Sequence, residues 1–187
     1  FTVRNTSNFF NDRMTLDLGF SYVIQKDQNM LSQGQYFNPI VPLYLFPRGE
    51  DFTPYRMYER YDEGRQLMTQ HWPYGEMGMA MQNPYWIINR NMFNNDRDRY
   101  MANAGLKYKV FDWMDISGRV RIDNANTRHT KKLYASTDAK FAQSKGYYGD
   151  RKDVDKQLYA DFLVNINKRF NDFDLTANVG ASIQDVS

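Results

Sequence analysis

The sequence predicts an all-β protein, a fragment of about six strands from a transmembrane antiparallel β-barrel with long extracellular loops. Its apolar side chains recur at every second position in runs of about ten residues, the length that a tilted strand needs to cross a bilayer. Short turns that contain aromatic residues alternate with long polar connections, as periplasmic turns and extracellular loops do in outer-membrane barrels. All 6 prolines fall within one of the long connections.

The first hairpin is expected at the start of the chain. Residues 1–10 alternate weakly, and residues 11–13 (Asn-Asp-Arg) follow as a turn. From Met14 the alternation is clean, with apolar side chains on one face and Thr, Asp, Gly and Ser on the other. We therefore expect strands at residues 1–10 and 14–25.

The first long connection is expected at residues 26–97, where the alternation stops. Proline cannot donate to a ladder of hydrogen bonds, so a stretch this rich in proline cannot lie in central strands. A connection of this length counts against a compact soluble domain but is normal for an extracellular loop of a barrel. The prolines are Pro39, Pro42, Pro47, Pro54, Pro73 and Pro84.

The second hairpin is expected at residues 100–110 and 115–124. Both strands carry aliphatic, aromatic or small side chains on one face and most of their charges on the other. A basic residue on the lipid face costs about 2–4 kcal/mol at the bilayer midplane, so the charged face is expected to line the lumen, where charges on neighbouring strands can pair. The predicted lumen-facing charges are Lys107, Lys109, Arg119, Arg121 and Asp123.

The third hairpin follows a second extracellular loop, expected at residues 125–156. Its strands at 157–168 and 174–184 alternate over their whole length. Phe170 and Phe173 flank the Asn-Asp turn, at the level where barrels carry an aromatic girdle. The alternation also fits an aromatic-rich soluble β-sandwich, which would bury the apolar face in a core, and strand length alone does not separate the two folds.

The composition excludes several classes of function. A net charge of +2 is too small for a nucleic-acid-binding protein without a cluster of Lys and Arg, and the absence of Cys excludes disulfides and thiol chemistry. No known catalytic or nucleotide-binding motif is present, so we predict neither enzyme activity nor a cofactor. His71 and His129 are far apart and lack the spacing of metal ligands, so no metal site is predicted.

A ligand site is predicted in the first long loop. Flat aromatic rings stack on sugar rings, and amides and carboxylates form hydrogen bonds with sugar hydroxyls. The candidate ligand-binding residues are Trp72, Tyr74, Asn83, Trp86 and Asp96. The alternative for Trp86 is that it packs the loop onto the barrel or against a covering protein.

Four segments resemble the SusC/RagA family of TonB-dependent outer-membrane transporters. They are Leu43–Phe52 (LYLFPRGEDF), Asn83–Asn91 (NPYWIINRN), Gly118–Asp123 (GRVRID) and Lys132–Asp138 (KLYASTD), and the first two are the more specific. The resemblance extends over nearly the whole chain.

The resemblance implies a 22-stranded barrel with an N-terminal plug domain, energised through TonB and covered outside by a SusD-like surface lipoprotein. It also implies import of oligosaccharides, or in some members of peptides, across the outer membrane. The plug, the segment that contacts TonB and the C-terminal strand are not in this sequence, so we expect an internal part of a longer chain. The alternatives are a passive porin or structural barrel, and a soluble carbohydrate-binding β-sandwich.

Overall fold

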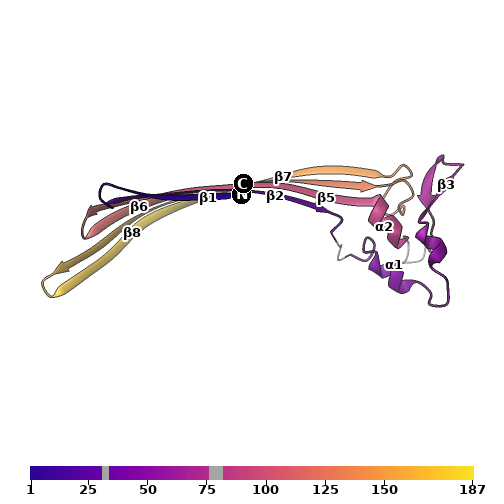
Figure 1. The fold of residues 1–187 in the computed structure, drawn as a ribbon, viewed down its shortest axis with the longest axis horizontal. Coiled ribbons are helices and arrows are strands. Elements are labelled where there is room, and N and C mark those ends of the chain that lie inside the picture. Colours follow the sequence, from indigo (N-terminus) through magenta and orange to yellow (C-terminus); the bar gives the residue numbers. More distant parts are fainter. Residues whose placement is uncertain (31–33, 76–81) are drawn as a thin grey trace. The chain divides into compact units, whose positions relative to one another are not determined.

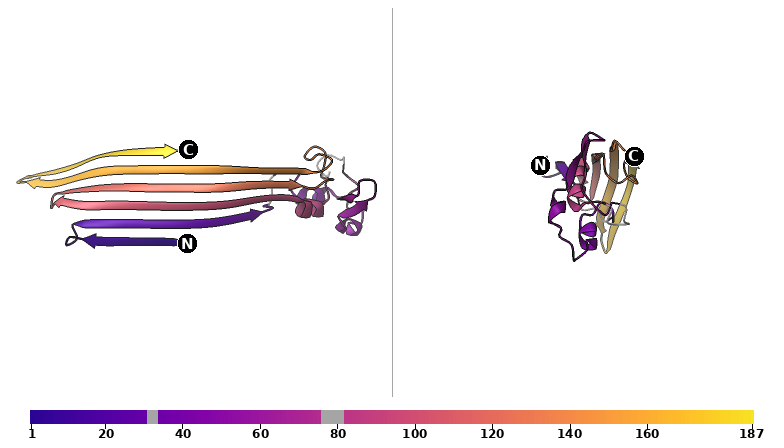
Figure 2. Two further views of the ribbon diagram at one scale, coloured as in Figure 1. Left: turned by 90° about the horizontal axis from the view of Figure 1, so that it is seen from above. Right: turned by 90° about the vertical axis from the view of Figure 1, so that its right-hand side faces the viewer.

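The computed structural model describes residues 1–30, 34–75 and 82–187. Six strands form one sheet in the order β1-β2-β5-β6-β7-β8, and Figures 1 and 2 show these strands side by side. The sheet strands are β1 (Thr2–Phe9), β2 (Met14–Gln28), β5 (Asn91–Phe111), β6 (Met114–Leu133), β7 (Tyr147–Phe170) and β8 (Phe173–Val186). The other elements are α1 (Ile40–Leu45), a 3-10 helix (Thr53–Arg56), β3 (Glu59–Asp62), β4 (Leu67–Gln70) and α2 (Pro84–Arg90).

The fold is predominantly antiparallel β, which confirms the coarser part of the prediction, an all-β protein. Strands β1 and β8 form the two edges of the six-stranded sheet, so the described residues do not close it into a barrel. The register of the outer hairpins follows the predicted turns: Phe9 lies opposite Met14, and Phe170 lies opposite Phe173. No proline lies in a described strand, as predicted from the missing N–H donor.

The chain divides into two compact units, which we describe separately. The sheet unit comprises Phe1–Gln25, Arg97–Thr127 and Asp153–Ser187. The loop unit comprises Lys26–Asp96 and Arg128–Lys152, and includes both α-helices and the small β3–β4 sheet. Strands β2, β5, β6 and β7 contribute residues to both units.

Two of the turns contain residues with a positive φ, in the left-handed backbone region that asparagine and aspartate tolerate and that a bulky phenylalanine rarely adopts. Phe10, Asn11 and Asp12 have φ of 57°, 52° and 61°, and Asn171 has φ of 48°. Asparagine and aspartate enter this region more readily than other side chains, because their short polar groups can form local hydrogen bonds. The third turn holds Phe111 and Trp113 in a stacked arrangement, with ring centroids 5.1 Å apart and an interplanar angle of 7°. All three predicted short turns are therefore present.

The strands run beyond the predicted boundaries, which corrects the loops expected at 26–97 and 125–156. β5 begins at Asn91, β6 continues to Leu133 and β7 begins at Tyr147. Hydrophobic alternation fails in these extensions because both faces carry polar side chains that pair across strands. His129 Nδ1 lies 2.6 Å from Asn95 Oδ1, for example, and Arg128 pairs with Asp150.

The loop unit has regular structure that the sequence analysis did not predict. Asn83 caps α2, because its Oδ1 accepts a hydrogen bond from the backbone N–H of Tyr85 at 2.8 Å, and Pro84 follows in the first turn. Arg90, in the last turn of α2, forms a bidentate ion pair with Glu59 of β3 at 2.7 and 2.8 Å. This pair joins the helix to the small sheet.

A chain of buried side-chain hydrogen bonds forms the centre of the loop unit. Trp86 Nε1 donates to Thr137 Oγ1 (3.2 Å), which in turn donates to Asn91 Oδ1 (2.8 Å). Asn91 Nδ2 donates to Gln82 Oε1 (3.1 Å), and Gln82 Nε2 donates to the carbonyl oxygen of Tyr36 (3.2 Å). Buried polar groups are costly unless they are paired, so this chain fixes the relative positions of its segments.

Candidate functional site

Aromatic rings gather in the loop unit around Phe46. Its ring centroid lies 5.0 Å from that of Phe52, 5.8 Å from that of Tyr55, and 5.9 Å from those of both Trp72 and Tyr74. Trp72 and Tyr74 also contact each other, with centroids 5.4 Å apart. All five side chains are partly exposed, so this aromatic cluster has a surface on which a planar ligand face can stack.

Glu50 adds a carboxylate to the aromatic cluster. The Tyr74 hydroxyl donates a hydrogen bond to Glu50 Oε2. This hydrogen bond, with a smaller contribution from burial, raises the pKa of Tyr74 to about 12. The phenol is neutral at physiological pH and its proton is donated to Glu50, so the pair presents acceptor oxygens to a ligand.

Two of the predicted ligand-binding residues have structural roles instead. Trp86 is 0% exposed and holds the buried hydrogen-bond chain at Thr137, as the alternative for this residue anticipated in part. Asn83 is also 0% exposed, and its Nδ2 donates to the carbonyl oxygens of Tyr55 and His71 at 2.8 and 3.0 Å. The prediction of ligand contact is wrong for both, because neither presents a surface to solvent.

Asp96 is exposed on β5, as a ligand-binding carboxylate needs to be, but it does not belong to the aromatic cluster. It interacts electrostatically with Arg128 of β6. Of the five candidates, Trp72 and Tyr74 are therefore the members of the aromatic cluster. Phe46, Phe52 and Tyr55 were not predicted as members of the site, although their aromatic side chains among prolines are a visible signal in the sequence.

In the sheet unit, ion pairs link neighbouring strands on one face, which we call the polar face. Lys107 Nζ lies 3.3 Å from Asp115 Oδ2, and Arg119 Nη2 lies 2.9 Å from Asp161 Oδ2. Asp123 pairs with Arg99. Strand alternation places Arg121 and Lys109 on the same face, so the five charges predicted together do share one face. The partners Arg99, Asp115 and Asp161 were not predicted.

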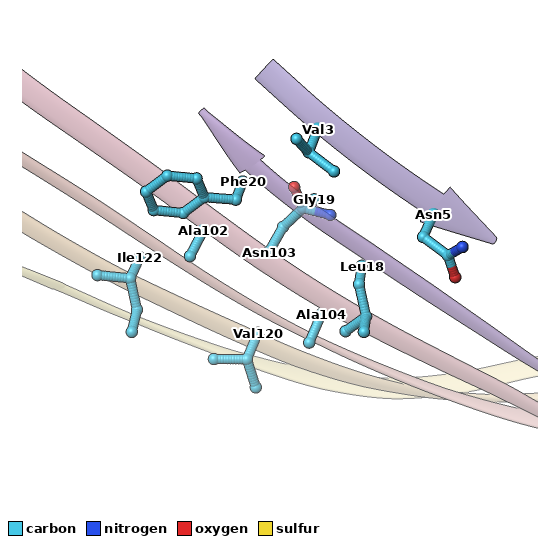
Figure 3. A pocket seen from close by; sticks show the side chains of 10 residues that line it. All are labelled: Val3, Asn5, Leu18, Gly19, Phe20, Ala102, Asn103, Ala104, Val120 and Ile122. Carbon is cyan, nitrogen blue, oxygen red and sulfur yellow. The ribbon is translucent and has the colours of Figure 1, made fainter. Parts of the chain in front are cut away.

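The opposite face of the sheet unit, the apolar face, carries aliphatic and aromatic side chains. This face contains a shallow groove of about 480 Å³. In Figure 3, Ala102 and Ala104 of β5 lie between Leu18 and Phe20 on one side and Val120 and Ile122 of β6 on the other. The described residues leave much of this face open to solvent: Leu18 is 43% exposed, Val120 46% and Phe162 51%. Further exposed members are Val3, Leu106, Ile122, Leu158, Val179 and Ile183.

Neither a metal centre nor a membrane-spanning helix is found in the described part of the chain. No three His, Asp or Glu side chains within residues 1–30, 34–75 and 82–187 are placed to hold a metal ion. Over the same ranges, no helix combines the length and the apolar character needed to cross a membrane.

The comparisons with known proteins do not assign a family. A scan against protein-family models found no match, and a search of curated proteins found no match either.

Proposed function

We propose that the chain is part of the barrel of a TonB-energised importer of the SusC/RagA kind in the outer membrane. One observation carries the proposal: a single-layered antiparallel sheet exposes an aliphatic and aromatic face and carries ion pairs on the other. An apolar face of this size needs lipid or a second protein layer against it. Among the described residues, no second sheet covers it. In a membrane barrel, lipid would cover the apolar face and the water-filled lumen would solvate the face that carries the ion pairs.

The lengths of the strands fit the same proposal. β5 has 21 residues, which at roughly 3.3 Å per residue is about 70 Å, whereas the hydrocarbon core of a bilayer is about 30 Å thick. The apolar alternation occupies only the sheet-unit part of the strand. The loop-unit part, with polar side chains on both faces, is then the extracellular extension of the wall.

The proposed importer carries oligosaccharides, or peptides, together with a SusD-like surface lipoprotein. It receives energy from TonB through a region outside this segment, and outer-membrane lipid surrounds it. Neither an enzyme activity nor a nucleic-acid partner is part of the proposal. The aromatic cluster, with Trp72 and Tyr74, is its extracellular ligand surface. Sugar rings stack on such clusters, and the Glu50 carboxylate provides a hydrogen-bond acceptor for hydroxyls.

The membrane assignment is tested by placing an arginine on each face of β6. Val120→Arg puts the charge on the apolar face, where it costs about 2–4 kcal/mol if that face meets lipid at mid-depth. Ser117→Arg puts the same charge on the polar face of the same strand. In the full-length protein we expect Val120→Arg to reduce outer-membrane insertion strongly, and Ser117→Arg to leave it nearly unchanged. Equal insertion of the two variants would contradict the assignment.

A second experiment separates the importer from the alternatives. If cells stop taking up the oligosaccharide or peptide when TonB is deleted, the result supports the importer. If uptake continues without TonB, the result indicates a passive porin. A protein that stays soluble and folded without detergent would instead support the soluble β-sandwich. The purified full-length protein and an isogenic TonB deletion strain are sufficient for both measurements.

A further inference from the structure

Three guanidinium groups surround one carboxylate on the polar face of the sheet unit. Asp123 of β6 is only 8% exposed, and Arg99 of β5 binds it with two hydrogen bonds, from Nε to Oδ1 at 2.8 Å and from Nη2 to Oδ2 at 2.5 Å. Arg97 and Arg121 also interact electrostatically with this carboxylate. The four side chains therefore carry three positive charges and one negative charge, a local surplus of two.

The three arginines differ in how they are paired. Arg99 donates one hydrogen bond to each oxygen of Asp123, whereas Arg97 and Arg121 interact with this carboxylate only electrostatically. Arg97 Nε is buried and has no hydrogen-bond partner among the described residues. Arg121, in contrast, is exposed on the same face. A buried donor without a partner is unusual in a folded protein and is explained when a ligand or water supplies the acceptor.

Arginine is suited to such an acceptor because its planar fork of N–H donors matches the two oxygens of a carboxylate or the oxygens of a sulfate. Charge-assisted hydrogen bonds of this kind are about twice as strong as those between neutral groups. The polar face also carries amides and hydroxyls, including Asn103 and the Thr2–Ser21 pair with oxygens 3.0 Å apart. Neutral groups of this kind can bind sugar hydroxyls.

We propose that Arg97 and Arg121, beside the Arg99–Asp123 pair, bind an acidic group of the solute, and that the solute is an oligosaccharide bearing carboxylate or sulfate groups. The assignment of this anion as a transported solute rests on the proposed importer, but the anion site itself does not. Rings of basic side chains favour anions in the same way in anion-selective pores.

The test is binding to the full-length protein purified in a neutral detergent, with two probes matched in size. Trigalacturonate carries three carboxylates, and maltotriose is neutral. We expect trigalacturonate to bind, maltotriose to bind at least tenfold more weakly at this site, and inorganic sulfate to compete with trigalacturonate. Arg121→Gln, at an exposed position, and Arg97→Gln are each expected to weaken trigalacturonate binding by tenfold or more.

Lys109→Gln is the matched control, because it removes one positive charge from the same face without touching this cluster. Retained binding in Lys109→Gln, with loss in Arg121→Gln, supports the site. Equal losses in both variants would overturn the site, because they would show only a general attraction of anions to the positively charged face. Equal affinity for the two probes would also overturn it, because it would show that the acidic groups do not contribute to binding. Tight binding of triglutamate without trigalacturonate would overturn the assignment to an oligosaccharide.

Binding in detergent is independent of membrane location and of TonB. If the anion site binds as expected but solute uptake continues after deletion of TonB, the inference stands and the importer is refuted. The opposite result, TonB-dependent uptake without preference for acidic sugars, removes the inference alone.

Discussion

Arg128 of β6 and Asp150 of β7 face each other in the loop unit, with Arg128 Nε 2.9 Å from Asp150 Oδ1 and Nη2 2.5 Å from Oδ2. The hydrogen bonds from Arg128 hold the pKa of Asp150 below its usual range. The pair spans the two strands that enclose the loop between Leu133 and Tyr147. The charge of Asp150 therefore affects how firmly β6 and β7 are held together on either side of that loop.

Acidification is expected to weaken the link between β6 and β7. A carboxylate with a depressed pKa stabilises the folded state above its unfolded pKa, near 3.8, and loses that effect as the pH falls through the lower folded pKa. Hydrogen exchange of the strand ends, corrected for intrinsic rates, should rise only below about pH 4 in the wild type. Asp150→Asn should show faster exchange at neutral pH and no such acid step. Lys132→Gln is the control, and an acid step that persists in Asp150→Asn would contradict the assignment.

Trp86→Ala is expected to destabilise the loop unit by about 3–5 kcal/mol, since it removes a fully buried indole and the donor to Thr137. Hydrogen exchange in α2 and in the β3–β4 hairpin measures the loss. Tyr44→Ala removes a side chain that is 84% exposed and should change stability by less than about 0.5 kcal/mol. Similar protection in both variants would show that the buried chain does not hold the loop unit together.

Glu50→Gln is expected to lower the pKa of Tyr74 from about 12 towards the ordinary value of 10. The hydrogen bond to the Glu50 carboxylate holds the phenol proton, and the amide accepts a weaker hydrogen bond and carries no charge while keeping the size of the side chain. Because the folded pKa is raised, Tyr74 contributes stability below pH 10 that is lost as the pH rises towards 12. Ultraviolet titration of tyrosinate, compared with Tyr74→Phe, assigns the group. An unchanged titration in Glu50→Gln would refute the contact.

Gly180→Ala is expected to cost about 1–3 kcal/mol through overpacking. A Cβ at Gly180 would lie 2.8 Å from the carbonyl oxygen of Phe162 and 2.9 Å from Leu163 Cδ1. At Gly118 the nearest atom, the carbonyl oxygen of Asp161, is 3.6 Å away, so Gly118→Ala should be tolerated. The midpoint of urea unfolding of the full-length protein compares the two, and equal midpoints would show that the β7–β8 hairpin relaxes at no cost.

Lys131→Met is expected to destabilise the loop unit by about 1 kcal/mol, because it keeps the aliphatic stem but removes a cation held among aromatic rings. Lys131 Nζ lies 5.4 Å from the ring centroid of Phe37, 5.5 Å from that of Phe93 and 5.3 Å from that of Tyr147. Lys131→Arg keeps the charge and should retain most of the stability. The thermal midpoint distinguishes them, and equal midpoints for the two variants would indicate packing alone.

The part of the fold that the sequence predicts is the part in which one face is apolar. In the sheet unit, the alternation from Met14 onwards and from Leu158 onwards places strands correctly, because one face of these strands carries apolar side chains and the other polar ones, which gives the sequence a period of two. Beyond Tyr100 towards Asn91, the same strand continues with polar side chains on both faces. Cross-strand contacts such as that between Asn95 and His129 stabilise this part of the strand, and such contacts leave no periodic pattern in the sequence.

The candidate site was predictable only where residue type fixes the role. Trp72 and Tyr74 lie in the aromatic cluster because large aromatic side chains pack against one another. Asn83 and Trp86 have the composition expected of a sugar site but form the buried frame. An Asn-Pro pair at a helix start could have revealed the cap at Asn83, whereas the burial of Trp86 depends on Thr137, distant in sequence.

The buried hydrogen-bond chain of the loop unit also constrains the order of folding. Gln82 and Tyr36 are separated by 46 positions, and Trp86 and Thr137 by 51. Contacts of such high contact order carry a loop-closure entropy that must be offset before they stabilise anything, so they form late. Asn91 stands at the start of β5, and Thr137 follows the end of β6. Pairing of those strands brings the distant segments closer together. The aromatic cluster is therefore expected to assemble only after the β5–β6 hairpin has formed.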